Sequence, residues 1–368
     1  MALHPPGGPG PYAAEVRHQI RRDVEENYRF VARQLNTNGV SVVSIQFEPR
    51  IWGGEHGEYV LDFVRELTVP FVVTLHHVDP DAGAEHAAIV AELADRAGAM
   101  VVMSRAAHKA VSGLPGVDPG RVELVPYGVA ALPLVGSDNA KARMGMLGKS
   151  LILSFGLMDS DKGIESVVGA MPVILQAVPS AHYAIVGAAR PALDGTDPES
   201  YERELGFTIA RSGLGQHIER VPRFVGRTEL AKWLQAADVV VAPSTRLDRT
   251  LDGTIACAMG AGKAIVATRS PYAAEQLAGG CGRLVGPDAP DEIAAAAIEI
   301  LGNRELRTEM GRQAYDRSRP MVWWKVTAEY RRIFERVAEA GRPLPRATAG
   351  RTPAHPRVFS HTSGPLIV

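Results

Sequence analysis

Short runs of apolar, often β-branched residues alternate with longer segments of helical periodicity along most of the chain. Such runs predict strands of parallel sheet, because a strand covered by helices on both faces is apolar throughout. In the first half, strands are predicted at 41–47, 70–75, 99–103 and 122–126. A second series is predicted at 151–155, 181–186, 218–224, 238–242, 264–268 and 282–285. The alternation indicates an α/β protein with two parallel sheets.

Apolar residues at helical spacing predict helices over 58–67, 84–96 and 321–340. Before residue 41 the pattern predicts one helix, over 13–35, and leaves hardly any room for a strand. We therefore expect the first domain to lack the opening strand and Gly-rich turn with which a nucleotide-binding α/β domain usually begins.

Changes in periodicity divide the chain into five parts. The second series of strands starts after a stretch rich in Gly, Pro and Ser, and the last residues are rich in Pro, Arg, Gly, Ser and Thr. The predicted parts are an N-terminal domain over 1–135 with an incomplete start, a linker over 136–149, a C-terminal domain over 150–320, a helix over 321–340 that crosses back to the first domain, and a disordered tail over 341–368.

Composition narrows the functional classes. The formal net charge of −1 over 368 residues gives no indication of nucleic-acid binding. The longest apolar runs have strand length, so no integral membrane segment is expected, and the N-terminus does not resemble a signal peptide. The two cysteines, Cys257 and Cys281, cannot form a disulfide framework or a cysteine metal site. A cytoplasmic location is the default expectation.

Polar residues follow two predicted strands of the first domain. Glu48 and Arg50 come after the first strand and would bind hydroxyl groups, and Gly53 and Gly54 would let a ligand approach the backbone. The alternative is a strand-to-helix turn with a solvated charge pair. His76 ends the next strand, where it would bind a sugar hydroxyl or move a proton; a purely structural role is equally compatible with the sequence.

The second domain begins with strand, loop and helix. Gly156 opens the loop, and Lys162 lies beside the predicted helix start, where an ammonium group would neutralise a diphosphate. The alternative is a helix-terminal lysine in solvent.

A second helix start lies at Gly253 and Thr254, before a helix of small residues. The N–H groups and dipole of a helix start favour an anion, and an ordinary crossover helix is the alternative. Around it, Arg249 would clamp a phosphate, Asp252 precedes the helix, and Glu275 would accept hydrogen bonds from ribose hydroxyls. Arg246 and Asp248 are more typical of a solvated mixed-charge loop.

In order and spacing, these segments resemble GT-B glycosyltransferases of the retaining group that includes glycogen synthase and bacterial mannosyltransferases, glycosyltransferase family 4. The resemblance covers roughly residues 13–337. It rests on Phe155-Gly-Leu with Lys162-Gly163, Val186-Gly187, Arg223-Phe-Val, Ala237-Asp238 to Pro243-Ser244, and Gly253-Thr with Gly260 to Thr268. Gln46-x-Glu48, Gly53-Gly54 and Thr74-Leu-His76 are similar to a bacterial subgroup.

The resemblance implies two Rossmann-like domains that face a central cleft, and a nucleotide-diphosphate sugar held mainly by the second. Lys162 and the Gly253-Thr254 helix start would hold the diphosphate. His76 would lie near the transferred sugar, and residues from Glu48 to Gly54 would face the sugar or a carbohydrate or glycosylated small-molecule acceptor. Transfer would retain the anomeric configuration and need neither metal nor cofactor. A partner protein or a homo-oligomer is compatible with this picture.

Three positions depart from the family pattern. Leu157 stands where an arginine is usual, and Arg249 and Cys257 occupy the places of the two glutamates of a Glu-x7-Glu motif. Asp252 and Glu275 are candidate substitutes. A non-catalytic GT-B protein that binds a sugar, nucleotide or partner enzyme is therefore the rival hypothesis, and an epimerase or phosphorylase on the same fold has less support.

Overall fold

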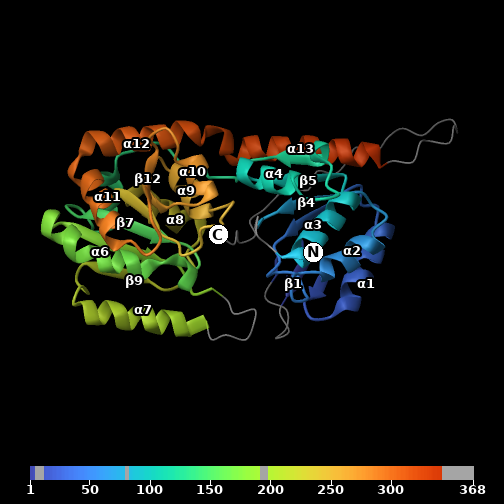
Figure 1. Cartoon of the computed structure of the whole chain (residues 1–368), viewed down its shortest axis with the longest axis horizontal. Coiled ribbons are helices and arrows are strands. Elements are labelled where there is room, and N and C mark those ends of the chain that lie inside the picture. The colour runs from blue at the N-terminus through green and yellow to red at the C-terminus, as the bar shows by residue number, and fades with distance from the viewer. Residues whose placement is uncertain (5–11, 79–82, 191–197, 342–368) are drawn as a thin grey trace.

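The computed structural model describes residues 1–4, 12–78, 83–190 and 198–341, which form two units side by side (Figure 1). Each unit is built on one parallel sheet, so the predicted α/β architecture with two parallel sheets is confirmed. Residues 342–368, for which we expected disorder, lie outside the described part of the chain.

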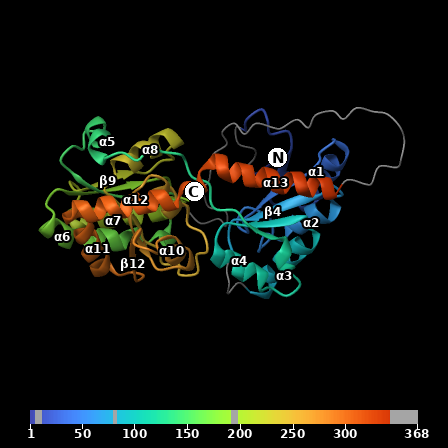
Figure 2. The ribbon, with the colours of Figure 1, turned by 90° about the horizontal axis from the view of Figure 1, so that it is seen from above.

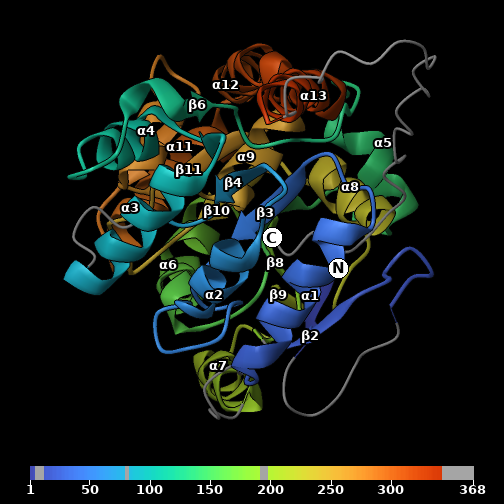
Figure 3. The ribbon, with the colours of Figure 1, turned by 90° about the vertical axis from the view of Figure 1, so that its right-hand side faces the viewer.

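The first unit contains a four-stranded parallel sheet in the order β3-β4-β5-β6. Its apolar residues alternate along β3, where Ile45 and Phe47 are fully buried against helices on one face. Helices α1 and α2 lie on this face, and helix α13 lies on the opposite face (Figure 3). The elements are α1 (Glu25–Thr37), β3 (Val43–Phe47), α2 (Tyr59–Glu66), β4 (Phe71–Leu75), α3 (Ala84–Arg96), β5 (Ala99–Val102), α4 (Arg105–Ser112), a 3₁₀ turn (Pro119–Arg121) and β6 (Val122–Leu124).

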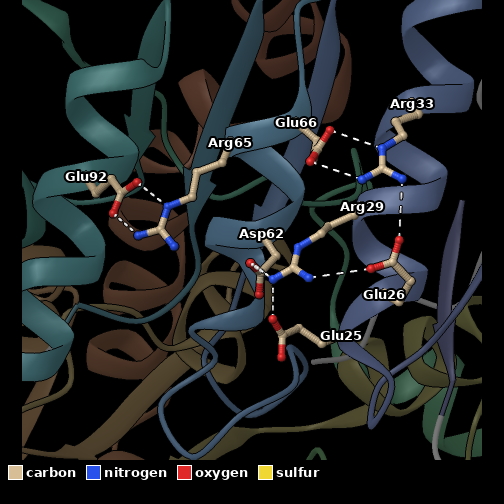
Figure 4. Close-up of polar contacts among 8 residues, drawn as sticks. All are labelled: Glu25, Glu26, Arg29, Arg33, Asp62, Arg65, Glu66 and Glu92. Atoms are coloured by element: carbon tan, nitrogen blue, oxygen red, sulfur yellow. Dashed lines mark hydrogen bonds and ion pairs between the residues drawn. The ribbon is translucent and has the colours of Figure 1, made fainter.

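Ion pairs connect the outer faces of α1, α2 and α3 (Figure 4). Arg29 of α1 reaches Asp62 of α2 at 2.8 Å, and Arg65 of α2 reaches Glu92 of α3 at 2.7 Å. Most of these side chains are at least partly exposed, and exposed pairs contribute little free energy of unfolding. The buried residues between the helices, such as Phe63, therefore carry most of the packing energy.

The N-terminal segment differs from the predicted helix over 13–35. Helix α1 starts only at Glu25, and two short parallel strands precede it, β1 (Ala2–His4) and β2 (Gln19–Arg21). Ile20 of β2 is fully buried, at a position that also fits the helical spacing of α1. Hydrophobic periodicity therefore continues across the true helix start and does not reveal it. The acidic pair Glu25 and Glu26 is a better signal of this start, because negative charges are stabilised in the first turn of a helix.

The second unit contains a six-stranded parallel sheet in the order β12-β11-β10-β7-β8-β9. Two separate apolar cores cover its faces. Its elements are β7 (Ser150–Phe155), a 3₁₀ turn (Ser160–Lys162), α6 (Ile164–Ala177), β8 (Ala181–Val186), α7 (Pro198–Ser212), β9 (Ile218–Val221), α8 (Arg227–Ala236), β10 (Val239–Ala242), α9 (Gly253–Gly260), β11 (Ala264–Thr268), α10 (Pro271–Gln276), β12 (Gly282–Val285), α11 (Pro290–Gly302) and α12 (Arg304–Arg317).

The segment predicted as a linker over 136–149 contains a helix, α5 (Ser137–Arg143). Its Lys141 is buried, and the ammonium group lies 2.5 Å from a carboxylate oxygen of Asp238 at the start of β10. The same carboxylate accepts the N–H of Leu151. This part of the chain is therefore packed on the second unit, and a helix of seven residues is too short to show periodicity in the sequence.

The chain returns to the first unit at its end. After a 3₁₀ turn (Arg319–Met321), α13 (Trp323–Ala340) lies across the first sheet (Figure 2). Val326, Ile333 and Val337 of this helix pack against the sheet residues Val72 and Val101. Among the described residues, no helix is long and apolar enough to cross a membrane.

Burial lowers the pKa of Lys263 to about 8, with Lys141 and Arg307 adding to the effect. In the unfolded chain the pKa of Lys263 keeps its ordinary value near 10.5. Between pH 8 and pH 10.5 the unfolded chain therefore holds the lysine proton while the folded protein has lost it. We expect the free energy of unfolding to rise by roughly 2–3 kcal/mol relative to Lys263→Met as pH increases from 7 to 10. Urea titrations of both proteins across this range measure the difference.

The matched control is Lys109→Met, which removes an exposed lysine of α4. Its stability should follow that of the wild type at each pH. A Lys263→Met protein whose stability tracks the wild type across the whole range would contradict the lowered pKa.

Candidate functional site

The two units meet where the loops after their strands face each other. Thr250, between β10 and α9, is 1% exposed, and its hydroxyl donates to the carbonyl of Val78 after β4 at 2.7 Å. Its own carbonyl accepts a hydrogen bond from the Ser104 hydroxyl, also at 2.7 Å. In parallel α/β sheets, ligands bind outside the carboxyl ends of the strands. The candidate site is therefore the region that these loops enclose.

Lys162 is positioned by two glycines and a hydroxyl. Its ammonium group donates to Thr254 Oγ1 at 3.2 Å. Gly156 has φ +127°, and a Cβ there would lie 3.1 Å from the lysine Nζ. A Cβ at Gly187, after β8, would lie 1.8 Å from the carbonyl oxygen of Gly156. The structure therefore brings together Gly156, Lys162 and Thr254, three of the predicted diphosphate residues.

The surroundings of Lys162 favour an anion. Burial lowers the pKa of its ammonium group, and the nearby cations Arg249 and Arg190 lower it further, whereas Asp252 and Asp159 oppose this shift. A bound anion would relieve both the desolvation and the repulsion between these cations. This region of the second unit is electrostatically prepared for a negatively charged ligand.

Arg249 is placed for such a ligand, whereas Arg246 is not. The Arg249 Nε donates to the hydroxyl of Ser244 at 3.0 Å, and its charge acts on Lys162. Arg246 forms an ion pair with Asp248, as expected of a mixed-charge loop. Lys162 and Arg249 therefore form the two-cation pair of the site.

The start of α9 differs from the open anion site that we expected. The carboxylate of Asp252 accepts the N–H groups of Thr254 at 2.8 Å and Ile255 at 3.2 Å, which is the ordinary role of an N-cap residue. A phosphate could approach the N–H of Gly253, but it would meet the negative charge of Asp252. The side chain of Asp252 therefore caps the helix, and its role in holding the diphosphate stays a prediction.

Glu48 of the first unit faces the arginines of the second. Burial raises the pKa of its carboxyl group, and the charges of Arg50, Arg190 and Arg246 oppose this shift. A carboxyl group with a raised pKa is suited to proton transfer. The structure thus places Glu48 in the site, and it places Arg50 beside it with an exposed side chain.

His76 lies at the same edge, directly after β4. Its Nε2 is 2.7 Å from the amide oxygen of Gln46, and its backbone N–H donates to the carbonyl of Phe47. Burial lowers the pKa of the ring, which favours the neutral imidazole. A neutral, oriented imidazole can accept a hydrogen bond from a hydroxyl group.

The backbone at Gly53 and Gly54 packs against other atoms of the chain. A Cβ at Gly53 would lie 2.0 Å from the carbonyl oxygen of Arg22, and one at Gly54 would meet the carboxylate of Glu58 at 2.2 Å. These glycines are needed because the chain's own atoms pack against them. Their predicted role on the acceptor side stays a prediction.

Glu275 is also engaged within the protein. Both of its carboxylate oxygens accept backbone N–H groups at the start of α4, from Arg105 and Ala106, each at 3.1 Å. The carboxylate thus caps a helix of the opposite unit, and its predicted contact with ribose stays a prediction. Cys257, which stands where a glutamate is usual, has a thiol whose pKa burial raises to about 12.

Four residues of this region had no assigned role in the sequence: Gln46, Arg190, Ser244 and Thr250. Arg190 comes three residues after Gly187, which directly follows β8. Its position after a buried strand and a glycine could therefore have identified it as a candidate from the sequence. It pairs with Asp159. The contact of Thr250 with Val78 joins residues 172 positions apart and has no local signal.

A hollow lies elsewhere on the second unit. It has a volume of about 430 Å³ and is lined by Met144, Met146, Glu219, Arg223, Glu229, Lys232 and Trp233. A cavity of about 10 Å³ lies beside Lys162, Asp252 and Thr254. The chemistry of the side chains, rather than the size of the hollow, therefore identifies the site. Among the described residues, no three His, Cys, Asp or Glu side chains converge as a metal site would require.

Residues 149–303 match the family model described as "Glycosyl transferases group 1". The second unit is a glycosyl transferase group 1 domain. A D-inositol 3-phosphate glycosyltransferase of Kineococcus radiotolerans is 30% identical over 272 residues, which are 68% of this chain and 60% of that protein. A phosphatidyl-myo-inositol mannosyltransferase of Mycolicibacterium smegmatis is 30% identical over 195 residues, 52% of this chain and 46% of that protein. The chain thus spans 60% or less of the length of these two relatives.

Solved structures show that the fold is GT-B. The Anabaena protein HepE, in complex with UDP-glucose, superposes with a TM-score of 0.66 and 18% identity over 85% of this chain and 81% of that chain. A sucrose-phosphate synthase from Thermosynechococcus elongatus gives a TM-score of 0.71 and 17% identity over 87% and 80%. The resemblance to GT-B glycosyltransferases is therefore confirmed.

Glu275→Ala removes the carboxylate that caps α4 from the opposite unit. We expect the backbone amides of Arg105 and Ala106 to exchange hydrogen faster, because a lost helix cap costs ~1 kcal/mol. Hydrogen exchange followed by mass spectrometry measures this. Glu299→Ala is the control, since Glu299 pairs with Arg283 inside the second unit. Equal protection of residues 105 and 106 in all three proteins would argue against the contact.

Proposed function

We propose that this protein is a glycosyltransferase that transfers a sugar from a nucleotide-diphosphate sugar to an acceptor hydroxyl, with retention of configuration and without a metal ion. The observation that carries the proposal is the convergence of Gly156, Lys162 and Thr254 beside Arg249 in a glycosyl transferase group 1 domain. The UDP-glucose bound to HepE supports a nucleotide sugar as donor. We place the protein in the cytoplasm.

In this proposal the second unit holds the leaving group. Lys162 and Arg249 stabilise the negative charge that develops on the departing diphosphate. Cationic side chains or a metal ion have this role in reactions with a phosphate leaving group. Because Arg249 supplies a cation near Lys162, it compensates for Leu157 at the position of the usual arginine.

The first unit supplies the groups that face the sugar. His76 accepts a hydrogen bond from a hydroxyl of the donor sugar or acceptor, and Glu48 exchanges a proton or orients a hydroxyl across from Arg190 and Arg246. Retention requires the acceptor hydroxyl to attack from the side on which the diphosphate leaves. The acceptor is a carbohydrate or a glycosylated small molecule in this scheme.

The second candidate function is a GT-B protein that binds a sugar, nucleotide or partner enzyme without transferring a sugar. Asp252 favours it, because its carboxylate already holds the N–H groups at the start of α9. Cys257 favours it as well, since a buried thiol of raised pKa cannot replace a carboxylate. The two candidates share nucleotide binding and differ in turnover, which a transfer assay with nucleotide sugars resolves.

Calorimetry with UDP, GDP and ADP tests the donor site. We expect binding of at least one of the three at millimolar concentration, and an affinity at least tenfold lower in Lys162→Met, because the variant loses a partly buried cation next to the phosphates. Lys232→Met, which removes an exposed lysine of α8, should bind as the wild type does. Absence of binding for all three nucleotides would rule out the donor site, and equal affinity of Lys162→Met would remove Lys162 from it.

Transfer in the presence of EDTA, with the anomer of the product read by NMR, tests metal independence and retention.

Asp252→Ser separates the helix cap from the negative charge. Serine also caps helices, so the fold should persist, while the carboxylate next to the phosphates is gone. We expect the affinity for the nucleoside diphosphate to rise about tenfold, the usual size of one charge at a helix start in a partly buried site. A lower affinity in Asp252→Ser, with an unchanged melting temperature, would show that the carboxylate contributes to binding instead.

A further inference from the structure

One hydrogen bond orients the ring of His76. The Nε2 atom lies 2.7 Å from the side-chain amide oxygen of Gln46, the residue next but one before Glu48. An amide oxygen only accepts hydrogen bonds, so Nε2 carries the ring proton and Nδ1 is left as an acceptor. The role of His76 itself rests on the proposed function.

The amide of Gln46 is held in turn by hydroxyl groups. Its Nε2 donates to Ser44 Oγ at 3.1 Å and lies 3.5 Å from Thr74 Oγ1. These contacts use the nitrogen end of the amide and direct its oxygen toward His76. Gln46 and Thr74 are opposite each other in the register of β3 and β4, so the sheet itself sets this geometry.

The last helix of the chain completes the arrangement. Tyr330 of α13 places its hydroxyl 3.1 Å from Thr74 Oγ1, and burial raises the pKa of this phenol, which keeps it neutral. A chain of side chains therefore runs from α13 through Thr74 and Gln46 to His76. It lies on the face of the sheet that α13 covers.

We propose that Gln46 is a positioning residue that holds His76 as its Nε2–H tautomer and presents Nδ1 to a hydroxyl of the sugar or acceptor. It acts through His76 and not on the substrate. Partners that orient a functional histidine through its second ring nitrogen typically contribute ~10–100-fold to affinity or activity, as metal-bound histidines show.

The test compares Gln46→Leu with Gln46→Glu at pH 8.5. Leucine removes the acceptor for Nε2–H, and we expect kcat to fall ~10–100-fold with the KM for the donor sugar unchanged. Glutamate keeps an acceptor oxygen at the same position, so kcat should return toward the wild-type value. A loss of packing alone would not be restored by a charged residue.

An NMR titration of the His76 ring tests the contact without any substrate. The carboxylate of Gln46→Glu should raise the His76 pKa by about one unit or more, since an opposite charge at hydrogen-bond distance favours the charged ring. Charged or titratable groups of these loops and of α13, among them Glu48, His77, Arg246, Asp248 and Tyr330, stay the same in every variant. Gln216→Glu, an exposed glutamine beside His217, is the matched control and should leave the His76 titration unchanged.

The outcomes are distinct. An identical His76 titration in Gln46→Glu and wild type would overturn the proposal, as would a kcat of Gln46→Leu equal to that of the wild type. A shifted titration together with an activity loss that Gln46→Glu reverses supports it. Absence of transfer in the wild type would overturn the proposed function, while the titration would still establish Gln46 as the partner of His76.

Discussion

The site depends on the contact that Thr250 makes with the first unit. Its hydroxyl and its carbonyl both hydrogen-bond to the opposite unit, and the side chain is buried there. Because Arg249 and Asp252 lie within two residues of Thr250, this contact also fixes the loop that carries charged residues of the candidate site. Glu275 adds a second connection between the units by capping α4. These polar contacts connect the units beside an apolar core that includes Met103 of the first unit and Ile255 of the second.

The charges of the site are nearly balanced within the protein. Arg190 forms an ion pair with Asp159, and Arg246 forms one with Asp248. The carboxylate of Asp252 accepts hydrogen bonds at the start of α9. Lys162 and Arg249 hydrogen-bond to hydroxyl groups, which leaves their charges available for a phosphate. In the family pattern that the sequence resembles, the helix start contributes more and a carboxylate binds the ribose. In the proposed function, side-chain cations therefore take over part of the role that backbone N–H groups have in the family pattern.

The sequence was sufficient for most of the fold but only for part of the site. Buried parallel strands such as β8 and β11 have unambiguous apolar runs, because helices cover both faces of the sheet. The predicted start of α1 was wrong because Ile20, which lies in β2, continues the helical spacing of apolar residues in α1. Lys162 could be found from its place after a strand and a glycine. The capping roles of Asp252 and Glu275 could not, since a carboxylate that binds ribose and one that caps a helix have the same local sequence.

The return of α13 to the first unit has a consequence for how the protein folds. Val72 and Val101 of the first sheet are covered by a helix that is synthesised after the entire second unit. The first unit therefore completes its apolar core with a helix from a distant part of the chain, although its strands come from consecutive sequence. On the ribosome, one face of its sheet stays open to solvent until residue 337 has emerged. Contacts of such large sequence separation slow folding, so the first unit is expected to reach its native state after the second.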